Sequence, residues 1–216
     1  MVQSPTSRLI VISGPSGAGK STVVDAVLAA SPLPMVLSVS ATTRKPRKGE
    51  VEGEDYYFLT REQFAERQAA GDFLECKEYA GNWYGTLQSQ VATGLAEGKW
   101  VLLEIDVEGT MAVLQKHPEA LTIFVHSGSI EELERRLRAR GTESEEALAR
   151  RLATANRELA QKDRYRYQVI NLDVPTAVNE VIEILLRHAR GDSAVCSGST
   201  RSDKTNSTST SSISTS

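Results

Sequence analysis

The chain has 216 residues, of which 40% are hydrophobic and 25% charged, as in ordinary globular proteins. This length suits one compact core with small inserted subdomains, or at most two small domains. The formal net charge of −3 argues against a general nucleic-acid binder, which needs a basic surface to neutralise phosphates.

Short apolar runs bounded by turn residues predict buried strands, and longer segments between capping residues predict helices. In chain order we expect a strand at 9–12, a helix at 20–30, a strand at 36–39, a loop at 42–55, a strand at 56–59, a helix at 60–70, strands at 73–79 and 83–86, a helix at 88–97, a strand at 100–105, a helix at 107–116, a strand at 121–125, helices at 129–140 and 142–160, a strand at 168–171 and a helix at 177–188.

Buried strands that alternate with helices predict a parallel sheet covered on both faces. Residues 39–86 are rich in strands and loops and interrupt this alternation, so we expect an inserted subdomain there, and a second, helical insertion at 128–160. The core would then comprise about 8–38, 87–127 and 167–190 of a domain at 1–191. Serine and threonine dominate residues 192–216, which predicts a disordered tail, with a linker remnant favoured over a regulatory segment.

Two cysteines, Cys76 and Cys196, lie far apart and show no metal-binding spacing. The first seven residues lack a basic segment followed by an apolar one. No apolar run approaches the roughly 20 residues that span a bilayer. We therefore expect a cytoplasmic protein with no membrane partner.

Residues 14–21 match the phosphate-binding pattern G-x-x-x-x-G-K-[ST] at every fixed position. An expected strand precedes the match and an expected helix follows it, so a glycine-rich turn without a ligand is strongly disfavoured. Glycines let backbone N–H groups approach phosphate oxygens, Lys20 can reach the β- and γ-phosphates, and the Ser21 hydroxyl can bind Mg²⁺. The ATP-binding candidates here are Gly14, Pro15, Ser16, Gly17, Ala18, Gly19, Lys20, Ser21 and Thr22.

Arg44 and Arg47 lie close together on an expected loop, and Tyr56 follows shortly after. Guanidinium groups bind phosphate oxygens in pairs, although a basic loop alone is more often solvated surface. Glu75 precedes a turn at 81–86. A carboxylate accepts hydrogen bonds from both N1–H and N2–H of guanine, a donor pattern that adenine lacks, and hydroxyls can complete the base edge.

Five segments, at 14–22, 40–58, 73–86, 102–109 and 136–146, together resemble the guanylate kinase family in order and spacing. The resemblance covers about residues 8–189. It implies an α/β fold: a P-loop NTPase-type parallel sheet with helices on both faces, an inserted mixed β subdomain that binds GMP, and a helical lid. It also implies Mg²⁺-dependent, in-line transfer of the γ-phosphoryl of ATP to GMP, with lid closure, giving ADP and GDP.

The resemblance also implies roles for individual residues. The GMP phosphate would be held by Arg44, Arg47, Tyr56 and Tyr84. The guanine would be read by Ser40, Glu75 and Thr86, with Asp106 beside the base. Glu104 is a nearby acid that can hold Mg²⁺ through water, as can Asp106, or can simply end a strand.

Three arginines, Arg136, Arg140 and Arg151, resemble lid residues that contact the transferring phosphoryl group, whereas the neighbouring arginines are better explained by surface ion pairs. With Lys20 and Arg44 they form the expected catalytic set. Asn171 matches a family position near the adenine. Here the family's Asn-Asp-Asp run has Leu172 in its middle position, which weakens that assignment.

Three alternative functions are compatible with parts of this sequence. A non-catalytic binding module of the same fold is disfavoured because the phosphate-binding loop and both acceptor arginines are complete. A P-loop kinase for another acceptor is disfavoured by Glu75, which fits the donor edge of guanine. A regulatory GTPase is disfavoured because no separate Asn-Lys-x-Asp guanine motif appears. The sequence leaves open the oligomeric state and activity on dGMP.

Overall fold

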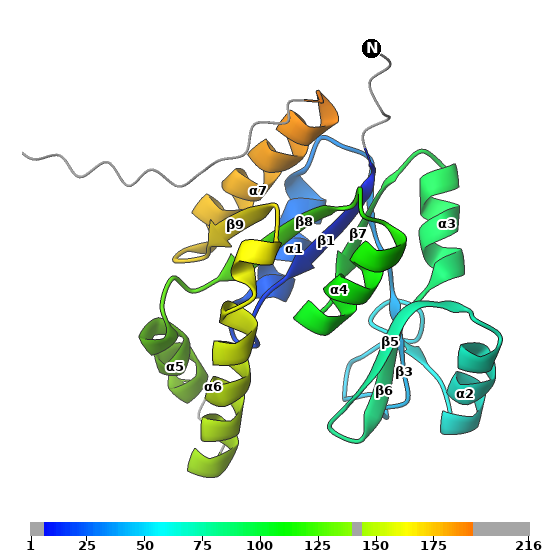
Figure 1. The fold of residues 1–216 in the computed structure, drawn as a ribbon, viewed down its shortest axis with the longest axis horizontal. Coiled ribbons are helices and arrows are strands. Elements are labelled where there is room, and N and C mark those ends of the chain that lie inside the picture. Colours follow the sequence, from blue (N-terminus) through cyan, green and yellow to red (C-terminus); the bar gives the residue numbers. More distant parts are fainter. Residues whose placement is uncertain (1–6, 140–143, 192–216) are drawn as a thin grey trace, which may run out of the picture.

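The computed structural model describes residues 7–139 and 144–191, and its centre is a parallel β-sheet (Figure 1). The strand order is β2-β7-β1-β8-β9, and every neighbouring pair is parallel. Its strands are β1 (Leu9–Ser13), β2 (Met35–Leu37), β7 (Trp100–Glu104), β8 (Leu121–His126) and β9 (Tyr167–Ile170). Parallel strands place their carboxyl ends at one edge, which is where α/β proteins bind ligands.

Helices cover both faces of this sheet, as the continuous apolar strands predict. In β1, Ile10 and Ile12 face the side packed by α1 (Lys20–Ala30) and α7 (Val174–Ala189). The alternate residues Leu9 and Val11 face α3 (Gln88–Ala96) and α4 (Val107–Lys116). The expected α/β fold is therefore confirmed.

A second, mixed sheet has the order β4-β3-β6-β5, with β3–β4 parallel and the other pairs antiparallel. Its strands are β3 (Ser40–Thr42), β4 (Tyr57–Phe58), β5 (Phe73–Tyr79) and β6 (Asn82–Leu87), and α2 (Arg61–Ala69) packs on it. The stacked rings of Phe64 and Phe73 form much of this small core. The sequence did not predict β3, because its short polar stretch becomes a strand only by pairing with β6.

Two helices, α5 (Ile130–Ala139) and α6 (Glu145–Leu159), pack through Leu133, Leu137 and Leu148 on the side of the core away from the mixed sheet (Figure 1). The expectation that α6 begins at Thr142 was wrong in its boundary. Ser144 caps this helix by accepting a hydrogen bond from the Ala147 N–H. Thr142 itself lies outside the described residues.

The last helix, α7, begins three residues earlier than expected. The Asp173 carboxylate accepts from the Thr176 N–H at 2.9 Å, and Pro175 falls in the first turn, where its missing N–H costs nothing. A 3₁₀ turn (Lys162–Arg164) precedes β9. Within the described ranges, no helix is both long and apolar enough to cross a membrane. The expected tail at 192–216 lies outside those ranges.

Candidate active site

The phosphate-binding loop joins β1 to α1 and closes around the Lys20 side chain. The Lys20 Nζ donates to the carbonyl oxygens of Gly14 at 2.7 Å and Pro15 at 3.2 Å. Gly14 has a φ of 144°, and a Cβ there would lie 1.9 Å from the Val125 carbonyl oxygen, so only glycine fits. Burial lowers the pKa of Lys20, an effect opposed first by Glu104. The predicted ATP-binding residues 14–22 all lie on this loop or in the first turn of α1.

The first turn of α1 meets the carboxyl end of β7. The Ser21 hydroxyl donates to Glu104 Oε1 at 2.7 Å. Both groups offer hard oxygen atoms, which fit Mg²⁺. The described residues contain no group of three or more His, Cys, Asp or Glu side chains able to hold a metal.

A cavity of about 340 Å³ lies between the phosphate-binding loop, the mixed sheet and α6. The predicted residues that line it, besides Gly14 and Ser16, are Lys20, Ser40, Tyr56, Glu75, Tyr84, Glu104, Asp106 and Arg151. These residues come from segments more than 100 positions apart in the sequence. The fold thus brings the predicted triphosphate site and most of the predicted acceptor site into one space.

The guanine-reading candidates lie side by side on three adjacent strands. Thr86 of β6 is paired with Ser40 of β3 on one side and with Glu75 of β5 on the other. The Thr86 hydroxyl donates to Glu75 Oε1 at 2.7 Å. Burial raises the pKa of the Glu75 carboxyl. This arrangement leaves an enclosed carboxylate held by one hydroxyl and facing the cavity.

The other oxygen of the Glu75 carboxylate lies against α4. A Cβ added to Gly109 would lie 2.9 Å from Glu75 Oε2. Asp106 caps this helix, because its Oδ1 accepts from the Gly109 N–H at 2.8 Å. Asp106 Oδ2 lies 2.5 Å from the Nζ of Lys77, which also contacts Glu108 at 2.8 Å. Lys77 was not among the predicted site residues, although its position two residues after Glu75 places it on the same face of β5.

Arg44 and Arg47 do not line the cavity. Arg44 makes two hydrogen bonds to the Glu50 carboxylate, at 2.9 and 3.0 Å, and Glu50 also accepts from the Arg47 N–H at 2.7 Å. Arg44 lowers the pKa of Glu50. The Arg44 guanidinium lies 5.3 Å from the centre of the Tyr56 ring, which in turn packs edge-on against Tyr84. Glu50 was missed from sequence, where it looks like one surface acid among many.

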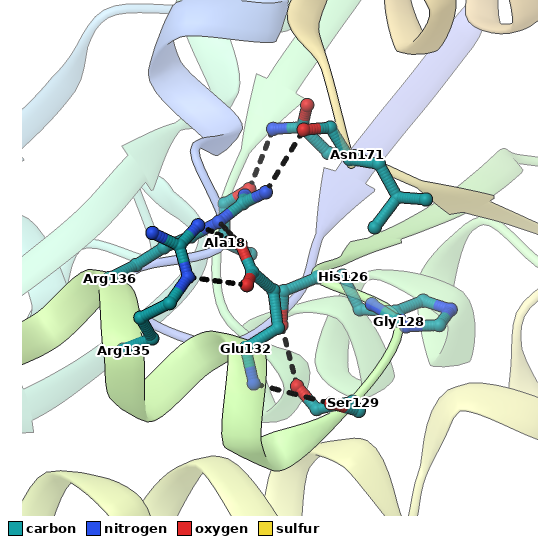
Figure 2. Close-up of polar contacts among 10 residues, drawn as sticks. Ala18, His126, Gly128, Ser129, Glu132, Arg135, Arg136 and Asn171 are labelled. Carbon is teal, nitrogen blue, oxygen red and sulfur yellow. Dashed lines mark hydrogen bonds and ion pairs between the residues drawn. The ribbon is translucent and has the colours of Figure 1, made fainter.

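The predicted lid arginines have different partners in the structure. Arg136 donates to Glu132 at 2.7 Å and to the Leu172 carbonyl at 3.2 Å, and Figure 2 shows Arg135 on the same carboxylate. These contacts with Arg135 and Arg136 lower the pKa of Glu132 to about 2. Arg151 of α6 donates to the Ser16 hydroxyl at 2.7 Å. Arg140 lies outside the described residues.

Asn171 contacts the back of the phosphate-binding loop. Its Nδ2 donates to the Ala18 carbonyl at 2.8 Å (Figure 2), and only 3% of the residue is exposed. Gly19 leaves room for it, since a Cβ there would lie 2.6 Å from Nδ2. Glu158 of α6 also lines the cavity, and burial raises its pKa. Neither placement could be predicted from local sequence patterns, because both depend on how β9 and α6 pack on the loop.

Comparison with known proteins identifies the family. The family model described as guanylate kinase matches residues 6–188. The guanylate kinase of Rhodopirellula baltica is 59% identical over 83% of this chain and 87% of its own length, and that of Rubrobacter xylanophilus is 52% identical over 85% and 96%. A crystal structure of guanylate kinase from Anaplasma phagocytophilum superposes with a TM-score of 0.70 at 30% identity, covering 88% of this chain and 89% of that one. The chain therefore belongs to the guanylate kinase family.

Proposed function

We propose that this chain transfers the γ-phosphoryl group of ATP to GMP, giving ADP and GDP, with Mg²⁺ as cofactor. The observation that carries the proposal is the shared cavity: Lys20 of the phosphate-binding loop and the enclosed Glu75 both line it. The curated relatives, named guanylate kinases, support the same reaction. In this assignment the Glu75 carboxylate accepts hydrogen bonds from N1–H and N2–H of guanine, and the hydroxyls of Ser40 and Thr86 complete the hydrogen bonding of the base edge.

The chemistry requires placement and charge rather than a general base, because the GMP phosphate is already an anionic nucleophile. Lys20 binds the β- and γ-phosphates and releases its two carbonyl partners to do so. Ser21 would bind Mg²⁺ directly, with Glu104 acting through water. When bound, Mg²⁺ neutralises charge on the transferring phosphoryl group. In-line attack of the GMP phosphate on the γ-phosphorus of ATP then requires that the two nucleotides are held next to each other in this cavity.

The acceptor phosphate is assigned to Arg44, Arg47, Tyr56 and Tyr84. In the structure Glu50 occupies the Nη1–Nη2 edge of the Arg44 guanidinium, an edge that a phosphate can also use. Binding of the GMP phosphate at this edge would therefore exchange one anionic partner of Arg44 for another. Tyr56 and Tyr84 line the cavity, so Arg44 would have to turn towards them to reach a phosphate bound there.

Arg136, Arg140 and Arg151 are assigned to the ATP phosphates. Arg151 already reaches the loop through Ser16, whereas Arg136 must exchange its contact with Glu132 for a phosphate. Closure of 128–160 over the core would exclude water and suppress hydrolysis of ATP in the absence of GMP. For Asn171 we propose that any contribution to ATP binding acts through the loop carbonyl it holds.

Production of ADP from Mg·ATP tests the proposal, with GMP, AMP, CMP and UMP offered separately as acceptors. Turnover with GMP alone, lost in Lys20→Ala and in Glu75→Ala, is the expected result. Turnover with another acceptor would keep the kinase assignment and reject the reading of guanine by Glu75. A folded protein that turned over no acceptor would instead favour a binding module.

A further inference from the structure

Lys77 is the one basic side chain of β5, and it lines the cavity. It takes no part in the phosphoryl transfer proposed for this site. Its Nζ lies 2.5 Å from Asp106 Oδ2 and 2.8 Å from Glu108 Oε2. Its side chain is only 25% exposed. A lysine held by two carboxylates at this depth is more restrained than an ordinary surface lysine.

The two carboxylates belong to the first turn of α4, so Lys77 fastens the mixed sheet to the core. Asp106 uses its other oxygen to cap α4 through the Gly109 N–H. Glu75 lies close to that same glycine, because a Cβ added to Gly109 would lie 2.9 Å from Glu75 Oε2. Lys77, Asp106 and Glu75 are therefore joined through one turn of one helix.

Charged groups of both signs surround Glu75. Burial and, to a smaller extent, Asp106 raise the pKa of Glu75, whereas hydrogen bonds from Thr86 and, to a smaller extent, Lys77 lower it. The remaining titratable groups that face this part of the cavity are Glu104 of β7, Glu158 of α6, Lys20 of α1, Arg151 of α6, and Tyr56, Tyr79 and Tyr84 of the mixed sheet. Of these cationic groups, Lys77 is the one that lowers the pKa of Glu75.

We infer that Lys77 is a positioning residue for the guanine site: by pairing with Asp106 at the start of α4 it holds Asp106 in place, and this keeps the neighbouring Glu75 carboxylate correctly placed for guanine. An ionised carboxylate accepts two hydrogen bonds from guanine, and a protonated one loses an acceptor. The inference rests on the proposed function, because it concerns the binding of GMP by Glu75.

Lys77→Met tests this role, because methionine keeps much of the aliphatic length and removes the charge. We expect the KM for GMP to rise about three- to tenfold, the order expected when one hydrogen bond of the base-reading site is weakened, while the KM for ATP and the kcat stay within about twofold. The acid limb of kcat/KM for GMP should move to higher pH, because Glu75 loses a neighbour that lowers its pKa. Lys77→Arg should restore both quantities towards wild type.

Lys99→Met is the matched control, since Lys99 pairs with Glu97 outside the cavity and should leave both quantities unchanged. Equilibrium binding of GMP without ATP separates the two proposals. Failure of the wild-type protein to bind GMP would overturn both. Binding by wild type with the same affinity and pH dependence in Lys77→Met would overturn this inference alone. Lower thermal stability of Lys77→Met with unchanged affinity for GMP would show a structural ion pair only, and would also reject it.

Discussion

Gly109→Ala should separate the binding of GMP from the stability of the fold. A Cβ at this position would lie 2.9 Å from Glu75 Oε2, while ordinary contacts begin at 3.4 Å, so the carboxylate must move by roughly 0.5 Å. The contacted atom is the end of a side chain, and the helix backbone can stay in place. The hydrogen bond between Glu75 and Thr86 would then weaken, as would the two hydrogen bonds that we propose Glu75 makes to guanine.

Loss of one hydrogen bond to a charged group costs about 1.5–3 kcal/mol, which is roughly a ten- to hundredfold rise in the KM for GMP. The free energy of unfolding should stay level or increase by up to about 1 kcal/mol, because alanine favours helix over glycine. Steady-state kinetics with each nucleotide varied, together with urea denaturation, measures both effects. The KM for ATP should not change.

Ala112→Gly is a suitable control, because it makes the reverse exchange further along α4. It should lower the free energy of unfolding by up to about 1 kcal/mol and leave the KM for GMP unchanged. Gly109→Ala with a normal KM for GMP, in protein shown to be folded, would refute the reasoning. An equal rise in both KM values would also refute it, since that would indicate a general disturbance of the core.

Burial raises the pKa of Glu75 in the folded protein above its ordinary value of 4.5. Protonated Glu75 therefore stabilises the fold. This contribution is complete below about pH 4.5, the pKa in the unfolded chain, and is lost as the pH rises through the folded-state pKa. Glu75→Gln should therefore melt at a higher temperature than wild type at pH 7, with the advantage vanishing below about pH 4.5; a constant difference across pH would contradict this. Asn171→Leu leaves the Ala18 carbonyl without its buried donor, and should lower the free energy of unfolding by about 1–3 kcal/mol and raise the KM for ATP; unchanged denaturation curves would count against it. Lys20→Met should reduce kcat at least about 100-fold without lowering the melting temperature, because it removes a buried charge; near-normal turnover would reject the role of Lys20.

The sequence by itself determined the α/β class, most elements and the phosphate-binding loop. These features are local: the glycine-rich turn lies between a continuous apolar strand and a helix start, so residues 9–30 encode both the structure and its chemistry. The boundaries of α1 and α4 were predicted to the residue. Family resemblance added Ser40, Tyr84, Thr86 and Asp106 to the candidates of the acceptor site and implied a role for each residue.

Only the tertiary structure decided how charges are partnered across the site. Strand β3 exists because β6 pairs with it, and Glu75 meets Thr86 because β5 and β6 are in register. The contacts of Lys77 with Asp106 and of Asn171 with Ala18 join segments whose approach no local pattern encodes. Hydrophobic periodicity specifies which face of an element is buried, but the partner of a polar side chain depends on how whole elements pack together.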